Sequence, residues 1–154
     1  MKNIFFMFLL VTALVGSYFF VDFNSLFNDV RGEVKFTSQL DECDLHKGPC
    51  DITLEDGTNF ALEVFPKDIP LMKTVTFKIT SKNYNKDIIP LDIYAKNMNM
   101  GTQSIKLKKI KENVYESNVI LPTCIRGNMK WNADIIMDKV SHRTGAKFKF
   151  KTDY

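Results

Sequence analysis

The chain has 154 residues, a length that suits a single domain. Its composition, with 45% hydrophobic and 25% charged residues, is that of a folded protein and excludes extensive disorder. The net charge of +3 is too small to indicate binding to nucleic acid, and no arginine-rich arm is present.

The first predicted element is an apolar segment. Residues 4–21 contain no charged side chain, and a helix needs roughly 20 apolar residues, or at least about 17, to cross a bilayer. Lys2 before the segment and Asp22 after it favour an orientation in which the rest of the chain is exported. We therefore predict a membrane anchor at 1–21, with a cleaved signal ending near Ser17 as the alternative.

Residues 22–42 are only weakly periodic, and we predict that they link the anchor to a folded domain at 43–154. Cys43 and Cys50 stand at the start of that domain, in the stretch CDLHKGPC. In an exported protein they can form a disulfide across the intervening Gly-Pro turn. The alternative is a pair of free thiols.

From residue 49 onward, apolar residues alternate with polar ones, as they do in half-buried strands. Turn signals separate the alternating runs, and Asp56-Gly57 is a typical hairpin turn. The predicted strands cover DITL, NFALEVF, TVTFKIT, IPLDIYA, SIKLKKI, NVYESNVIL, KWNADIIMD and KFKFKT. Strands of this kind without any helical period predict an all-β fold, with two antiparallel sheets packed as a sandwich.

Groups that carry chemistry are sparse. The two histidines, His46 and His142, lie in separate polar segments. The sequence contains no local signature of a catalytic triad, no phosphate-binding glycine loop and no HExxH motif. We therefore predict that the protein is not an enzyme.

Met98 and Met100 are the first candidate ligands. In the run that begins at Ile89 the odd positions are apolar through Ala95, so continued alternation places both methionines on the outward face. Two such positions on one strand are about 6.6 Å apart, which lets two thioethers reach one ion. The alternative is that a bulge near Asn97 reverses the phase and turns both side chains into the core.

A second segment, LPTCIRGNMKW, adds Cys124 and Met129. Cys124 has no predicted partner, which leaves it as a metal ligand, a reactive thiol, an intermolecular cysteine or a buried thiol. Met129 stands two residues before Trp131 and so faces the same side of the predicted strand. It is therefore either a ligand or part of the core. Thiolate and thioether donors select Cu(I). If the two segments lie at the same end of the sandwich, the predicted copper ligands are Met98, Met100, Cys124 and Met129.

The same motifs carry a family resemblance. MNMG at 98–101 and CIRGNMKW at 124–131, with CDLHKGPC, ITLEDG, LEVFPKDIPLMK and KFKF, resemble small exported proteins of Gram-negative bacteria that are similar to the YtkA-like and FixH-like domains. The resemblance implies an immunoglobulin-like β-sandwich of seven or eight strands behind one N-terminal transmembrane helix, on the periplasmic side of the bacterial inner membrane.

The resemblance also implies a role in copper handling or in the assembly of copper-containing oxidases, whose assembly components would be the acceptors of the metal. Carried over residue by residue, it assigns the ligand role to Met98, Met100, Cys124 and Met129. No histidine adjoins these methionines in the sequence, which favours Cu(I) over Cu(II).

A second hypothesis involves no metal. An accessory or interaction subunit of a membrane complex would use Met98, Met100 and Trp131 as an adaptable apolar contact patch. A third hypothesis makes Cys124 a thiol that exchanges disulfides, and the absence of a CxxC motif argues against it.

Overall fold

The computed structural model describes residues 6–7, 11–12, 34–123, 127–138 and 143–152. The chain divides into two units, Met1–Glu33 and Val34–Tyr154. Most of the predicted anchor, residues 1–21, falls outside the described ranges. Within those ranges, no helix has the length and the apolar character needed to cross a membrane.

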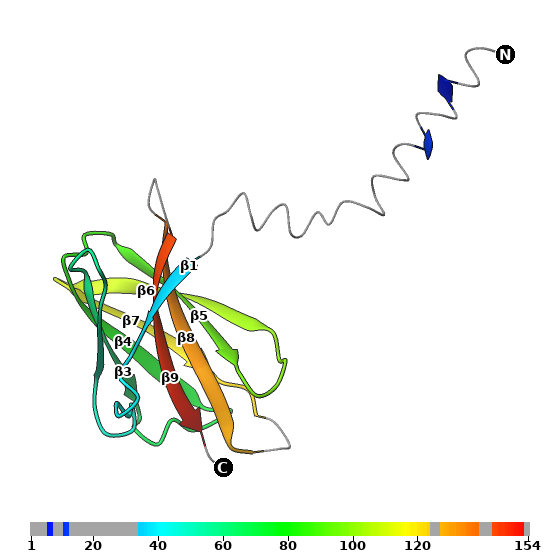
Figure 1. Cartoon of the computed structure of the whole chain (residues 1–154). Coiled ribbons are helices and arrows are strands. Elements are labelled where there is room, and N and C mark those ends of the chain that lie inside the picture. Colours follow the sequence, from blue (N-terminus) through cyan, green and yellow to red (C-terminus); the bar gives the residue numbers. More distant parts are fainter. Residues whose placement is uncertain (1–5, 8–10, 13–33, 124–126, 139–142, 153–154) are drawn as a thin grey trace. The chain divides into compact units, whose positions relative to one another are not determined.

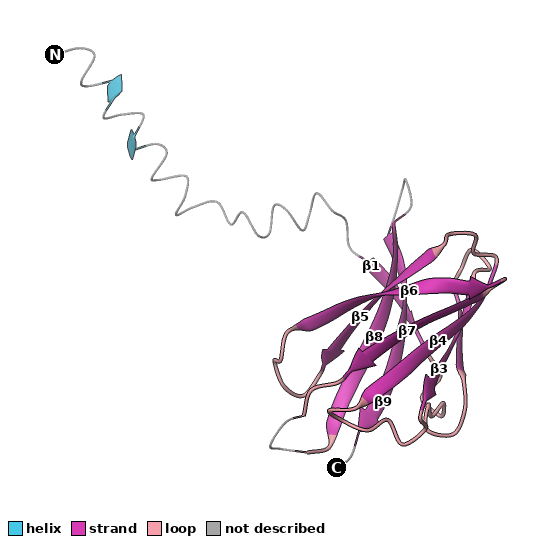
Figure 2. Ribbon diagram, turned by 180° about the vertical axis from the view of Figure 1, so that it is seen from behind, coloured by secondary structure: helices cyan, strands magenta, loops and turns pink. Residues whose placement is uncertain are grey.

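Nine β-strands make up the second unit (Figures 1 and 2): β1 Val34–Ser38, β2 Cys50–Thr53, β3 Asn59–Phe65, β4 Thr74–Lys82, β5 Ile88–Ala95, β6 Thr102–Lys111, β7 Val114–Ile120, β8 Met129–Asp138 and β9 Arg143–Thr152. The described residues of this unit contain no helix, so the predicted all-β fold is confirmed. Each of the predicted strands is present. The additional strand is β1, which lies inside the segment 22–42 that we predicted to be a linker.

All nine strands join one sheet in the order β1-β9-β8-β5-β6-β7-β4-β3-β2. β1 pairs with β9 in parallel, whereas the other pairs are antiparallel. Because β6 bonds to both β5 and β7, the two halves of the sandwich-like fold are continuous through this strand. The sheet curls until β2, at one edge, contacts β1 and β9 at the other. Its inner face therefore lines a single core.

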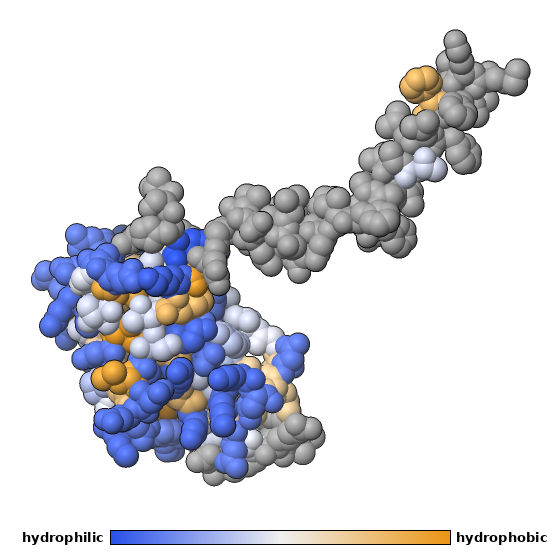
Figure 3. Space-filling view, in the orientation of Figure 1, coloured by the Kyte–Doolittle hydropathy of each residue, from blue (hydrophilic) through white to orange (hydrophobic). Residues whose placement is uncertain are grey.

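Burial follows the predicted alternation. In β4 the side chains of Val75, Phe77 and Ile79 are buried, and the residues between them are more exposed. The hydrophobic core takes side chains of this kind from every strand from β2 to β9. Full burial of one such side chain stabilises a fold by about 1.5–3 kcal/mol, so the alternation determines which face of each strand points inward. The visible outer surface is mostly hydrophilic, with smaller hydrophobic areas between (Figure 3).

Strand β1 packs on β9 through one close contact. Phe36 lies opposite Gly145 in the register of the two strands. A Cβ atom at position 145 would lie 2.6 Å from Cε1 of Phe36 and 2.8 Å from the carbonyl oxygen of Ile135. The ammonium group of Lys147 lies 4.2 Å from the centroid of the Phe36 ring, within the range of a cation–π contact. The lack of a side chain at 145 is what lets the aromatic ring lie against β9.

Gly145→Ala is expected to displace β1, because the new methyl group would overlap both an aromatic ring and a backbone oxygen. Overpacking of this kind costs about 1–3 kcal/mol, and denaturant unfolding measures the loss. Gly48→Ala is the matched control, since nothing lies within 4 Å of the Cβ position there. Equal free energies of unfolding for the two variants would contradict this account of β1.

Candidate metal centre

The loop at 96–101, which joins β5 to β6, lies beside the start of β8 (Figure 1). The side-chain amide of Asn97 donates to the carbonyl of Asn128 over 3.1 Å, and its oxygen accepts from the N–H of Lys130 over 3.1 Å. The N–H of Lys96 donates to the carbonyl of Lys130 over 2.7 Å. Three hydrogen bonds thus bring together the two sequence segments that carry the candidate methionines.

Met98 and Met100 do not lie on the outward face of a strand, as continued alternation predicted. Both side chains are half-buried and pack against the core. The physical reason is that β5 ends at Ala95, so the period of two no longer applies beyond it. The loop then turns back at Gly101, whose φ of 76° lies in the left-handed region that glycine adopts without strain. Both residues remain partly exposed.

Met129 is fully buried, with 0% exposure, and belongs to the core. It is the first residue of β8 and shares the inward face with Trp131, which is 3% exposed. Alternate residues of a strand face the same side of the sheet, which explains why both side chains are buried. Met129 can therefore reach an ion only from the inner side of the sheet.

Met72 also lies at this end of the sheet, although we did not predict it as a ligand. It stands just before β4, and its N–H donates to the carbonyl of Leu121 over 2.9 Å. Its side chain is 63% exposed, and its φ of 57° is unusual for a residue with a side chain. The pairing of Thr74 with Ile120 places this loop beside the end of β7.

One end of the sheet therefore collects thioethers. The chain has seven methionines, and Met1 and Met7 precede the sheet. Of the other five, only Met137, near the opposite end of β8, lies elsewhere. We call this region the methionine end, and its members are Met72, Met98, Met100 and Met129.

Cys124 lies outside the described residues. The loop that contains it leaves β7 after Ile120 and reaches β8 at Met129, so both described flanks of the loop are at the methionine end. In the parts of the chain that the structure describes, no three or more His, Cys, Asp or Glu side chains gather as a metal site. Methionine is not one of those four residue types. The candidate donors among the described residues at this end are therefore the thioether sulfur atoms of methionine.

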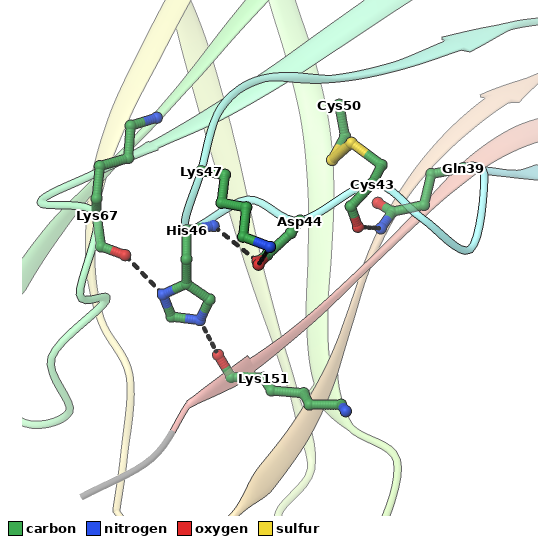
Figure 4. Close-up of polar contacts among 8 residues, drawn as sticks. All are labelled: Gln39, Cys43, Asp44, His46, Lys47, Cys50, Lys67 and Lys151. Carbon is green, nitrogen blue, oxygen red and sulfur yellow. Dashed lines mark hydrogen bonds and ion pairs between the residues drawn. A yellow bond between two sulfur atoms is a disulfide. The ribbon is translucent and has the colours of Figure 1, made fainter.

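His46 is at the methionine end too, but both of its ring nitrogens are engaged (Figure 4). Nδ1 lies 2.6 Å from the carbonyl oxygen of Lys67 and Nε2 lies 2.8 Å from that of Lys151. Both partners are backbone carbonyl oxygens, so each ring nitrogen is already in contact with the main chain. His46 therefore joins three segments of backbone, and we do not count it among the candidate ligands.

The disulfide predicted between Cys43 and Cys50 is confirmed, and it closes the loop that carries His46 (Figure 4). The side-chain amide of Gln39 donates to the carbonyl of Cys43 over 3.1 Å and to that of Lys149 over 2.9 Å, so it fixes this loop on β9. An open groove of about 610 Å³ runs between the loop and strands β8 and β9. Two kinds of charged side chain line this groove: the lysines Lys47, Lys96, Lys130, Lys149 and Lys151, and the acidic residues Asp41, Glu42 and Asp44. Lys47 forms an ion pair with Asp44, and Lys149 forms one with Asp41.

A second cluster of polar side chains lies on β5, β8 and β9. The hydroxyl of Tyr94 donates to Oδ2 of Asp134 over 3.0 Å and accepts from Asn132 over 3.1 Å and from Lys147 over 2.9 Å. Lys147 and Asp134 also form an ion pair of 3.0 Å. Oδ1 of Asp134 is buried without a hydrogen-bond partner among the described atoms.

Burial raises the pKa of Asp134 above its ordinary value and outweighs the lowering by hydrogen bonds and charge from Lys147 and Tyr94. Burial lowers the pKa of Lys147, but its hydrogen bonds to Tyr94 and Asp134 and their charges raise it overall. These groups satisfy one another's hydrogen-bonding capacity, apart from Oδ1 of Asp134. We therefore assign the cluster a structural role.

Comparisons with known proteins give no family. The chain matches no protein-family model, and no curated protein is similar to it. Among solved structures, a DUF4785 family protein from Legionella pneumophila subsp. pneumophila str. Philadelphia 1 aligns with a TM-score of 0.41 and 15% identity. The alignment covers 63% of this chain and 28% of that protein. A similarity at this level assigns neither a fold nor a function.

Asn97→Ala is expected to separate the loop at 96–101 from β8, because it removes both side-chain hydrogen bonds. The expected loss is about 1–3 kcal/mol in the free energy of unfolding, with faster amide exchange at Lys130. Asn99→Ala is the matched control, since that side chain accepts only from the N–H of Gly101, within the same loop. Unchanged exchange at Lys130 in Asn97→Ala would show that other contacts hold the two segments together.

The raised pKa of Asp134 predicts that its contribution to stability falls as pH rises. The folded state favours the protonated carboxyl, so the contribution is complete below the ordinary value of 3.8 and is lost as pH rises through the folded-state pKa. Urea unfolding of the wild type and Asp134→Asn between about pH 3 and about pH 7 tests this. Relative to the variant, the wild type should lose stability with rising pH. A relative gain would mean that Lys147 dominates over burial.

Proposed function

We propose that the protein is a membrane-tethered periplasmic module, not an enzyme, that binds Cu(I) at the methionine end for storage or for delivery to a copper oxidase assembly component. The observation that supports this most is the gathering of four thioethers, from three separate parts of the chain, at one end of the sheet. Cys124 belongs to the loop whose flanks lie there, so it is the proposed thiolate donor.

The donor set suits the monovalent ion. Thioethers are soft ligands that prefer Cu(I), and they need no deprotonation, so such a site also binds at acidic pH. Met98 and Met100 come from one short loop and keep part of their surface exposed, while Met72 is largely exposed. An incoming acceptor ligand can attack an ion held by such donors, which suits transfer. Met129, which is part of the core that Met98 and Met100 pack against, is proposed as a fourth or supporting donor.

The proposed placement of the domain rests on the sequence at 1–21 and on the resemblance to YtkA-like and FixH-like domains. We propose that this segment is the membrane anchor and that the domain lies in the periplasm. A disulfide supports an oxidising compartment. An immunoglobulin-like sandwich is supported by the connections of the sheet, since β4 and β5 are consecutive but not neighbours, and neither are β7 and β8.

The second candidate function is a non-enzymatic interaction subunit of a membrane complex. The apolar patch that the sequence suggested for this role needs correction, because Trp131 is buried in the core. Other residues favour the role. Met72 is exposed at the methionine end, and so is Ile120, at 53%. The groove along β8 and β9 carries five lysines and three acidic residues, and its excess of positive charge would suit an acidic partner.

Competition for Cu(I) with a chromophoric chelator, under anaerobic conditions and with the full chain in detergent, measures the proposed affinity. Met98→Leu with Met100→Leu should lower the affinity by about tenfold or more, because leucine keeps the apolar volume but removes the sulfur donor. Met72→Leu should show a smaller loss. Met137→Leu is the matched control and should bind as the wild type does.

Two results would remove the copper proposal: no competition with the chelator, or equal affinities for the double variant and Met137→Leu. In that event, crosslinking in membranes decides whether the interaction subunit is the better description. The supporting result there is one stable protein partner that persists when copper is withheld and is lost on Met72→Ser.

A further inference from the structure

The end of the sheet opposite the methionine end carries a cluster of lysines on β6. This strand contains four lysines and no acidic residue. Two exposed isoleucines lie among them, Ile88 at 43% and Ile110 at 55% exposure. A hollow of about 500 Å³ is lined by most of these side chains. We call the cluster the lysine patch, and its members are Ile88, Lys106, Lys108, Lys109, Ile110 and Lys111.

The local geometry of β6 exposes these residues together. Leu107 is buried, so alternation alone would turn Lys109 and Lys111 inward as well. Instead, the register between β6 and β7 shifts between Lys109 and Lys111, and all residues from 108 to 111 are exposed. Ile88 is the direct cross-strand partner of Lys108, which places an apolar side chain beside an ammonium group.

The positive charge of the lysine patch is not neutralised within the sheet. None of its lysines takes part in an ion pair with a described residue. The carboxylates nearby are Asp87 and Glu112, just outside the strands, and Glu116 on β7, which is the cross-strand partner of Lys108. Lys86 adds a further positive charge. The lysines therefore outnumber the carboxylates, and apolar surface lies between them.

The register of the sheet places the lysine patch at the end where the chain joins it. Asp92 pairs with Asp134 across β5 and β8. Ile88 lies four residues before Asp92, and Asp138 lies four residues after Asp134. Because β5 and β8 are antiparallel, Ile88 and Asp138 lie toward the same end of the sheet. Asp138 pairs with Arg143, and Arg143 pairs with Val34, the first residue of β1. The start of β1 and the lysine patch thus share one end of the sheet.

We propose that the lysine patch docks on the surface of a bilayer that contains anionic lipids. Exposed ammonium groups attract anionic headgroups, and isoleucines beside them can enter the interface. We favour the membrane over an acidic protein as the partner because of the proposed anchor at 1–21. Residues 22–33 connect this anchor to Val34, and even a fully extended chain of this length keeps Val34 within about 40 Å of the bilayer. The effective concentration of lipid at this end is therefore high. This inference rests on the proposed tether for its geometry.

Docking at the lysine patch orients the copper site. The strands β5 and β6 connect the two ends of the sheet, and a strand of ten residues is roughly 33 Å long. With the lysine patch on the bilayer, the methionine end faces away from the membrane. An acceptor would then meet the site from the periplasm or through a domain that projects from the membrane.

Acylation of lysines in the full chain, reconstituted into nanodiscs, tests the docking. One set of discs contains phosphatidylcholine alone, and the other contains about one third phosphatidylglycerol. Neither lipid has an amine, so the reagent reports on the protein. The acylation rates of Lys106 and Lys108 should fall several-fold in anionic discs and recover at high salt. Lys130 and Lys151, at the methionine end, are the internal controls and should react equally in both.

The apolar contribution is tested by Ile110→Ser, which should restore much of the acylation in anionic discs. Ile120→Ser is the matched control, because Ile120 has a similar exposure but lies at the methionine end. Equal acylation of the lysine patch in both kinds of disc would overturn the proposal. So would equal protection by soluble polyglutamate added to neutral discs, which would point to an acidic protein.

Failure of the tether is distinguishable from failure of the docking. If alkaline carbonate removes the chain from the discs, the proposed anchor is wrong. The same lysines are then probed with phosphatidylglycerol vesicles added to the full chain in solution. Protection of the lysine patch under those conditions supports docking without a tether, and its absence removes the docking proposal as well.

Discussion

The antiparallel pairing of β5 with β8 determines what each end of this molecule contains. The two strands are far apart in the sequence, and their register sets Ala95 against Trp131. That pairing brings the loop after β5 beside the loop before β8, and Asn97 then connects the two with its side chain. The same register leaves Ile88 and the start of β1 together at the other end. Without it, the loop that carries Met98 and Met100 would not lie beside the start of β8.

The proposed copper site would give the methionines at one end two physical roles that compete for the same side chains. Burial of a thioether against the core stabilises the fold as any apolar group does, and Met129 is wholly used in this way. A ligand must instead keep its sulfur within reach of an ion. Met98 and Met100 satisfy both demands in part, because their stems contact the core while some surface stays open. Methionine suits such positions because its unbranched chain adapts to either contact.

The strands were predictable because burial imposes a period of two on the residues that face the core. β1 was not, because VKFTS is short and pairs with the last strand of the sheet, a contact that no local pattern reveals. The disulfide was predictable from a short spacing with a turn between the cysteines, in a chain that we predict to be exported. The orientation of Met98 and Met100 was not, since alternation holds only while the strand continues, and β5 ends at Ala95.

Met72 and His46 show why a site of this kind escapes inspection of the sequence. Both reach the methionine end through backbone contacts with distant segments, Met72 with Leu121 and His46 with Lys67 and Lys151. The histidine, the residue type that sequence reasoning would first take for a ligand, is occupied by two carbonyls. The methionine, in a segment with no metal motif, is exposed. Ligand capacity thus depends on which side chains the backbone has already used, and at this end two carbonyl oxygens occupy the ring nitrogens of His46. The donor set of the proposed copper site is therefore soft as a consequence of the fold and not of composition alone.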